Sequence, residues 1–339
     1  MLAAAAASAP VSLKFDSGFS HEGEGPLKIA VDVFAPPGGV APRALLWCLP
    51  GGNMNRRYYD LLPPREDGNG DGGGAPDDSD GSFSFARTLA AQGYVVASAD
   101  YLGLGDSDRP NDGWLCTPDN LTAINRHVYA ALLAQLHAGT AHPRLGPLPG
   151  LRSIGVGHSM GGMMTILQQA AQQPHVALAV MGFSTRGLPD YVPKELHGVD
   201  SLVLRPKLTG MARKAFGEPF PIMQRTPESR GIFGGNGADP RGIVALKAAS
   251  DAMLPIPAFL SMLPGNVAPE AETVTVPVFL ALGSRDMAGP PHQVPAAFPN
   301  SADVTLHIAA EAGHAHFLFA SRARLFARVD AWARTVMAE

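Results

Sequence analysis

Apolar residues in this chain fall into two kinds of segment that alternate along it. Short apolar runs bounded by turn-forming residues are typical of strands. They occupy residues 11–15, 27–34, 43–52, 94–100, 151–159, 175–184, 274–286 and 302–314. Longer segments with apolar residues every three or four positions predict helices at 82–93, 118–139, 160–173 and 321–337. This alternation predicts an α/β fold, in which a mostly parallel central sheet opens with an antiparallel pair and carries helices on both faces.

The alternation stops between residues 186 and 270, in a stretch that is rich in Pro, Gly and Met. We interpret residues 186–270 as a cap inserted into one core domain, which consists of residues 1–185 and 271–339. The cap contains the sequence MLPIPAFLSMLPG, whose apolar side chains are suited to contact with a hydrophobic ligand. We therefore expect the cap to set substrate choice.

Length and composition fit one large α/β domain with an insertion. Of the 339 residues, 46% are hydrophobic and 17% are charged, which is typical of a globular protein. The net charge of −4, without a basic cluster, argues against a nucleic-acid partner. No apolar run reaches the ~18 residues that span a membrane. The start, MLAAAAASAP, lacks the basic residues of a signal peptide. We expect a cytoplasmic protein without an integral membrane segment, and nothing in the sequence indicates its oligomeric state.

Cysteine is rare in the chain, which contains only Cys48 and Cys116. Two cysteines cannot build a disulfide framework or a thiolate metal site. Cys48 lies in the apolar run ALLWCLP and is expected to pack as a small hydrophobic residue. A bridge between the two cysteines is the alternative.

One acidic, glycine-rich stretch, residues 65–81, interrupts the core pattern. Asp67, Asn69, Asp71 and Gly72 match the opening of a calcium-binding loop. The twelfth position of that loop is Asp rather than Glu, the eighth is Gly where an apolar residue is expected, and no predicted helix leads into it. We interpret the stretch as an acidic surface loop rather than a calcium site.

Ser159 lies in the sequence Gly-His-Ser-Met-Gly, residues 157–161, between a predicted buried strand and a predicted helix. In that context the G-x-S-x-G pattern predicts a strained turn that projects the serine hydroxyl from the carboxyl end of the sheet, where α/β sheets bind ligands. The N–H group of Met160 would then stabilise an oxyanion at the start of the helix. The alternative is an ordinary serine that caps the helix.

A serine nucleophile needs a base, and the base needs an orienting acid. Asp286 and His314 come at the carboxyl ends of the last two apolar runs, just after the strands expected there, so both are expected at the same edge of the sheet as Ser159. Their order along the chain, Ser then Asp then His, is the order of the triad that uses a G-x-S-x-G turn.

Other residues could take these roles. His316 is the alternative to His314 as the base, and Asp251 or Asp190 could replace Asp286, although neither follows a clear strand. His158 is expected to pack or form a hydrogen bond beneath the serine turn.

The second oxyanion donor is expected in the loop after residues 43–49, which reads Pro-Gly-Gly-Asn. Because glycine lets the backbone approach a substrate closely, Gly52 or Asn53 is the candidate donor. A purely structural turn would also explain the two glycines.

Together these residues resemble the α/β-hydrolase fold superfamily over most of the chain. The sequence GHSMGG looks like the nucleophile turn of its esterases and lipases. Residues 99–108, ADYLGLGDSD, are similar to the turn after the fourth strand, in which we interpret Asp100 and Ser107 as structural. One departure is Pro50-Gly51-Gly52, where members of the superfamily often carry His-Gly.

These observations predict a serine hydrolase that cleaves a carboxylic ester or a related acyl compound, in which Ser159 attacks, His314 carries the proton and Asp286 orients the imidazole. Met163 and Met164 fit a pocket for a small hydrophobic substrate, although core packing explains them as well. We expect no cofactor and no metal. The alternatives are an amide hydrolase, an acyltransferase, a cofactor-free perhydrolase or haloperoxidase, and a non-catalytic binding protein. A serine nucleophile excludes the carboxylate chemistry of dehalogenases and epoxide hydrolases.

Overall fold

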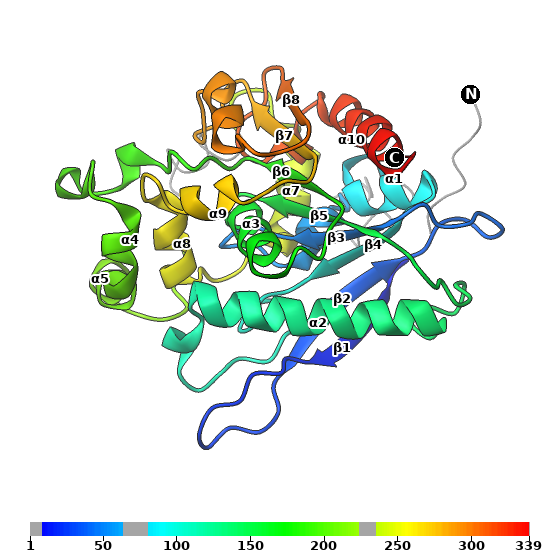
Figure 1. The fold of residues 1–339 in the computed structure, drawn as a ribbon, viewed down its shortest axis with the longest axis horizontal. Coiled ribbons are helices and arrows are strands. Elements are labelled where there is room, and N and C mark those ends of the chain that lie inside the picture. Colours follow the sequence, from blue (N-terminus) through cyan, green and yellow to red (C-terminus); the bar gives the residue numbers. More distant parts are fainter. Residues whose placement is uncertain (1–8, 64–80, 224–234, 339) are drawn as a thin grey trace, which may run out of the picture.

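The central sheet contains eight strands within residues 9–63, 81–223 and 235–338, the parts of the chain that this computed structural model describes (Figure 1). The sheet order is β1-β2-β4-β3-β5-β6-β7-β8. The strands are β1 (Val11–Asp16), β2 (Lys28–Phe34), β3 (Leu45–Leu49), β4 (Val95–Ala99), β5 (Ser153–His158), β6 (Ala177–Met181), β7 (Val278–Gly283) and β8 (Val304–Ala309). Each lies within a run that the sequence pattern predicts, except that β1 extends one residue further, to Asp16.

Strand pairing confirms the mostly parallel sheet. β2 runs antiparallel to both β1 and β4, and the remaining neighbours pair in parallel. The inner strands are buried along their whole length because helices cover both faces. Within β3, side chains alternate between two cores: Leu45, Trp47 and Leu49 belong to one, and Leu46 and Cys48 to the other.

Two pairs of helices pack on the two faces of the sheet and contribute to these cores (Figure 1). One face is covered by α2 (Pro118–Ala138) and α3 (Met160–Gln172), and the other by α1 (Phe85–Ala91) and α10 (Arg322–Ala338). The helix predicted at 82–93 begins later than expected. Its first residues form a 3₁₀ turn, and the Ser84 side chain accepts a hydrogen bond from the Arg87 N–H, which caps α1.

Between β6 and β7 the described residues form helices and no strand of the sheet. These helices are α4 (Ser201–Leu204), α5 (Leu208–Phe216), α7 (Pro240–Ala249), α8 (Pro255–Met262) and α9 (Ala268–Glu272). α4 and α5 lie at the left edge of Figure 1, whereas α7 contributes to the core beneath α1 and α10. The role of residues 186–270 as a cap stays a prediction.

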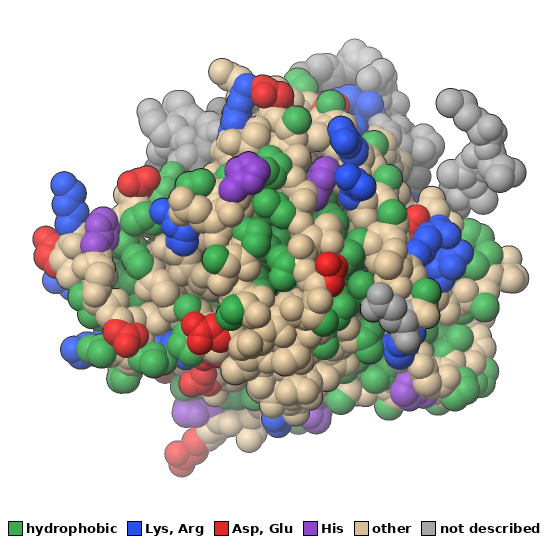
Figure 2. All heavy atoms as spheres, turned by 45° about the horizontal axis from the view of Figure 1, so that its top comes forward, with side chains coloured by type: hydrophobic (Ala, Val, Ile, Leu, Met, Phe, Trp, Pro, Cys, Tyr) green, Lys and Arg blue, Asp and Glu red, His purple; other side chains and the backbone are tan. Residues whose placement is uncertain are grey.

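Cys48 and Cys116 are free and buried, so the alternative of a bridge between them is wrong. Asp67, Asn69 and Asp71, the residues that resemble a calcium loop, lie outside the described part of the chain. None of the helices in the described residues is long and apolar enough to cross a membrane. On the face shown in Figure 2, Lys and Arg side chains are scattered among acidic and apolar ones rather than gathered into one patch.

Candidate active site

Ser159 occupies a strained turn directly between β5 and α3. Its backbone has φ 56° and ψ −127°, a conformation that costs free energy in a residue with a side chain. The turn is tight: a Cβ atom on Gly157 would collide with the backbone of Gly161, and one on Gly161 would collide with the Leu49 carbonyl oxygen. The Ser159 side chain forms no capping hydrogen bond with α3, so the interpretation of this residue as a simple helix cap is wrong.

The Ser159 hydroxyl faces His314. The distance between Ser159 Oγ and His314 Nε2 is 2.9 Å, and the distance between His314 Nδ1 and Asp286 Oδ1 is also 2.9 Å. An ionised carboxylate can only accept, so Nδ1 carries a hydrogen and donates a hydrogen bond to Asp286. Nε2 is then left to accept the hydrogen bond from the Ser159 hydroxyl. The structure thus brings the three predicted side chains into one continuous chain of hydrogen bonds.

Asp286 is buried, yet it stays ionised because it is surrounded by donors. Its Oδ1 also accepts a hydrogen bond from the Ala288 N–H at 3.0 Å, and its Oδ2 lies 2.7 Å from His316 Nε2. Burial opposes the negative charge, but the electrostatic interactions and hydrogen bonds with His314 and His316 outweigh it and hold the pKa of the carboxyl well below its usual value.

The structure separates the alternatives for these roles. His316 contacts Asp286 rather than Ser159. Asp251 accepts hydrogen bonds from the Asn55 side chain and the Gly105 N–H, and Asp190 is exposed on a 3₁₀ turn.

His158 lies beneath the serine turn, as predicted. Its Nε2 is 2.9 Å from the carbonyl oxygen of His314, and its ring stacks on Tyr58 with centroids 4.6 Å apart. Burial, followed by the neighbouring histidines, lowers the pKa of His158 well below its ordinary value. The neutral ring therefore donates its Nε2–H to the carbonyl oxygen.

The loop that contains Gly51 and Gly52 passes close to the serine turn. A Cβ atom on Gly51 would lie 3.4 Å from Ser159 Cβ, and one on Gly52 would lie 3.1 Å from Met160 Sδ. Among the described residues, the N–H groups of Met160, Gly52 and Asn53 donate no hydrogen bond within the protein. These donors are thus free, and which of them meets a substrate stays a prediction.

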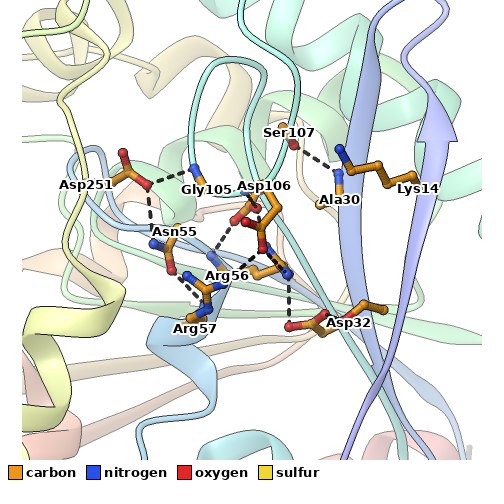
Figure 3. Close-up of polar contacts among 12 residues, drawn as sticks. Lys14, Ala30, Asp32, Asn55, Arg56, Arg57, Gly105, Asp106, Ser107 and Asp251 are labelled. Carbon is orange, nitrogen blue, oxygen red and sulfur yellow. Dashed lines mark hydrogen bonds and ion pairs between the residues drawn. The ribbon is translucent and has the colours of Figure 1, made fainter.

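Arg56 anchors the end of this loop through three carboxylates (Figure 3). Its Nη1 lies 2.5 Å from Asp100, its Nε 2.9 Å from Asp32 and its Nη2 2.6 Å from Asp106. Asp100 also accepts a hydrogen bond from the Arg56 N–H at 2.6 Å. Burial would lower the pKa of Arg56, but Asp100 and Asp32 outweigh it and raise that pKa. Asp100 thus holds the loop, as the sequence suggests, while Arg56 is a partner that the sequence does not reveal.

Asp251 ties the other side of the loop to the predicted cap (Figure 3). Its Oδ2 accepts hydrogen bonds from Asn55 Nδ2 at 3.3 Å and from the Gly105 N–H at 2.8 Å. Its own N–H donates to the Asn53 carbonyl oxygen at 2.9 Å. Nearby, Ser107 Oγ accepts a hydrogen bond from the N–H of Ala30, which supports its structural role.

A small pocket opens beside Ser159 and His314. We call it the Ser159 pocket; the other residues that line it are Met160, Gly182, Phe183, Ser184, Gly187, Leu188, Ser261, Met287 and Ala288. Met163 and Met164 do not reach it. Both side chains are fully buried in the hydrophobic core and neither lines the pocket, so the prediction that they line a substrate pocket is wrong.

The comparisons with known proteins agree with this arrangement. The sequence matches the model of the alpha/beta hydrolase family over residues 48–329, a range that includes Ser159, Asp286 and His314. The chain belongs to this family. No protein with a curated description matches the sequence. Membership confirms the resemblance inferred from the motifs and supports a hydrolase.

Solved structures of the same fold have different activities. The chain is similar to a thermostable carboxyl esterase from Bacillus coagulans, with 16% identity, a TM-score of 0.63, and 97% and 99% of the two chains covered. It is similar to a proline iminopeptidase from Mycobacterium smegmatis, with 18% identity, a TM-score of 0.57, and 97% and 99% covered. It is also similar to a bromoperoxidase from Bacillus anthracis, with 16% identity, a TM-score of 0.55, and 96% and 100% covered. At these identities the likeness shows the fold, and the site must decide the chemistry.

Proposed function

We propose that the protein is a serine hydrolase that cleaves carboxylic esters through an acyl-enzyme on Ser159. The observation that carries this proposal is the chain of two 2.9 Å contacts from Ser159 through His314 to Asp286, with the serine on a strained turn at the carboxyl end of β5. A binding protein would have no need to maintain this strain and this alignment, so we favour catalysis over a non-catalytic role.

The first half-reaction forms the acyl-enzyme. Ser159 Oγ attacks the ester carbonyl carbon while its proton passes to His314 Nε2, and the carbonyl electron pair moves onto oxygen. Asp286 stabilises the imidazolium that results. When the C–O bond to the alcohol breaks, His314 returns the proton to the leaving oxygen. Water then attacks the acyl-enzyme by the same proton transfers, which release the acid and restore the Ser159 hydroxyl.

The oxyanion is stabilised at the start of α3. The Met160 N–H lies at the positive end of this helix, and Gly52 or Asn53 supplies the second N–H from the neighbouring loop. Both contacts form without rearrangement because these donors have no other partner among the described residues. Pre-arranged donors of this kind typically contribute about 3 to 4 kcal/mol to transition-state stabilisation.

The Ser159 pocket favours a short, uncharged acyl group. Ser184 Oγ accepts a hydrogen bond from the Arg186 N–H, and Ser261 Oγ donates one to the Ala258 carbonyl oxygen, so both hydroxyls already have partners. The described residues that line the pocket include no Asp, Glu, Lys or Arg. A charged acyl group would therefore lose its hydration without a compensating ion pair.

The walls of the pocket are fixed by the end of α8. The Leu188 N–H donates to the Met262 carbonyl oxygen at 2.8 Å, and a Cβ atom on Gly187 would collide with the same stretch of backbone. A long acyl chain would have to displace Leu188 or Met287, which both line the pocket. Amide hydrolysis, acyl transfer and perhydrolysis could use the same three residues; the uncharged pocket argues against substrates with a free amino group beside the carbonyl.

The proposal is tested by hydrolysis of 4-nitrophenyl acetate. We expect turnover by the wild-type protein and a loss in kcat of ~10⁴-fold or more in Ser159→Ala. Ser20→Ala, on the exposed connection between β1 and β2, is the matched control and should retain full activity. Equal rates for wild type and Ser159→Ala would contradict the proposal.

A further inference from the structure

His316 gives Asp286 a second imidazole partner, and the reaction described above does not use it. His316 begins a 3₁₀ turn, His316–Leu318, and its side chain is completely buried. Its Nε2 lies 2.7 Å from Asp286 Oδ2, while His314 Nδ1 lies 2.9 Å from Oδ1. Each oxygen of the carboxylate therefore has its own histidine.

The contact distance identifies the tautomer of His316. An unprotonated Nε2 would place its lone pair 2.7 Å from a negatively charged oxygen, which is repulsive, whereas Nε2–H makes a charge-assisted hydrogen bond. The Gly283 N–H also lies 3.1 Å from Nε2, and it could donate a hydrogen bond there only if Nε2 were unprotonated and Nδ1 carried the hydrogen. The bond to the carboxylate outweighs it, since charge-assisted bonds are roughly twice as strong as neutral ones.

The other ring nitrogen shows that His316 is neutral. Nδ1 is buried and has no hydrogen-bond partner among the described residues. Protonation of Nδ1 would bury a charged N–H without an acceptor, which is costly. The ring is completely buried and packs edge-to-face against His158, with centroids 5.4 Å apart.

Three other titratable groups near this pair, His158, His307 and Tyr58, are neutral as well. Burial lowers the pKa of His158 well below its ordinary value, and it also lowers the pKa of His307, with Arg328 and Arg324 acting in the same direction. Burial, with a smaller contribution from Asp286, raises the pKa of Tyr58 well above its ordinary value. Asp286 and His314 are thus the groups whose charge His316 can influence.

We propose that His316 is a positioning residue that acts on the reaction through Asp286, an inference that rests on the proposed function. Its Nε2–H fixes the plane of the carboxylate so that Oδ1 faces His314. Without it, Oδ2 would be a buried, charged oxygen with no other hydrogen-bond partner among the described residues, and the carboxyl could rotate. The same bond withdraws charge from the carboxylate, which lowers the tendency of His314 to retain a proton and so keeps it available as a base at lower pH.

The test compares His316→Gln, which keeps a donor near the position of Nε2, with His316→Leu, which removes it at similar volume. We expect His316→Leu to lower kcat by about 10-fold or more and to move the acidic limb of the kcat/KM profile to higher pH. The shift is upward because a carboxylate with fewer donors is more basic and holds the imidazolium proton more tightly. His316→Gln should keep kcat within about threefold of the wild-type value and leave the acidic limb close to its wild-type position.

Two results would overturn the proposal. One is a His316→Leu variant that loses thermal stability while kcat and the acidic limb stay unchanged. The other is a His316→Gln variant that is as impaired as His316→Leu.

A second measurement does not depend on activity or on a folded leucine variant. In wild-type protein labelled with ¹⁵N-histidine, the resonances that disappear in His316→Gln should belong to a neutral ring protonated at Nε2. A ring protonated at Nδ1 would exclude the hydrogen bond to Asp286. Because this readout needs no substrate, it separates the failure of this inference from the failure of the proposed function.

Discussion

The Nε2–H group of His158 donates a hydrogen bond to the carbonyl oxygen of His314 over 2.9 Å. His158, the residue before Ser159, thereby fixes the backbone of His314, whose side chain contacts Ser159. The centroids of the His158 and His314 rings lie 4.9 Å apart, and the Tyr58 ring stacks on His158. The hydrogen bond of His158 thus adds to the direct contact between Ser159 and His314 in holding these two residues together.

Replacement of His158 by Phe tests this link. Phe keeps the ring that stacks on Tyr58 but removes one of the two donors to the buried His314 carbonyl oxygen, which keeps only the His316 N–H at 3.0 Å; the lost bond contributes about 1 kcal/mol. We expect that loss in the free energy of unfolding from urea titration, together with a lower kcat. His158→Gln, which can still donate, should be less affected; equal stability of the Phe variant and the wild type would show that the bond contributes nothing.

Asp286 should make stability depend on pH in the acidic range. Its folded pKa lies well below the ordinary value of about 3.9, so its ionised form stabilises the folded state above that pH. This contribution is lost as the pH falls through the folded pKa. We therefore expect the difference in unfolding free energy between wild type and Asp286→Asn to narrow below pH ~4, as measured by urea titration at several pH values. A difference that stays constant or widens there would contradict the depressed pKa.

Arg56 and Arg57 offer a matched comparison, because both pair with Asp106 but only Arg56 is buried. Arg56→Met removes the positive charge that pairs with Asp32 and Asp100, and breaking a buried ion pair in this way costs ~3–5 kcal/mol. Arg57→Met breaks an exposed pair and should cost less than about 1 kcal/mol. Chemical denaturation of the two variants checks this ranking, and a reversed or equal ranking would rule out the anchoring role.

Leu188 should limit the length of the acyl chain. We expect the wild-type kcat/KM for 4-nitrophenyl esters to peak at two to four carbons and to fall by ~10-fold or more at eight. Leu188→Ala should shift the optimum to longer chains and leave acetate almost unchanged. Leu202→Ala, on the exposed surface of α4, is the control with wild-type selectivity. A wild-type optimum at eight carbons or more would refute the short-acyl preference.

The features that can be predicted from the sequence are those that local patterns encode. Strands and helices follow from the spacing of apolar residues, and Ser159 follows from a motif set between a strand and a helix. Asp286 and His314 follow from their places after β7 and β8, because the carboxyl ends of parallel strands meet at one edge of the sheet.

The residues that sequence reasoning misses depend on contacts between distant segments. In the sequence, His314 and His316 lie two positions apart and either could be the base. In the structure a 3₁₀ turn begins at His316, and each ring contacts a different oxygen of Asp286. The buried Arg56 forms ion pairs with carboxylates from β2 and from the turn after β4, and no local sequence pattern predicts such a cluster. Met163 falls in the core because the first turn of α3 packs beneath the sheet.

The most direct measurement of the central claim is covalent labelling of the pure protein with a fluorophosphonate, located by peptide mass mapping. The reagent reacts with a serine whose hydroxyl is activated by a base. We predict one adduct, on Ser159, that is absent in Ser159→Ala and at least about 10³-fold slower to form in His314→Ala. A folded wild-type protein that carries no adduct on Ser159, or that labels equally fast without His314, would contradict an activated serine at this site.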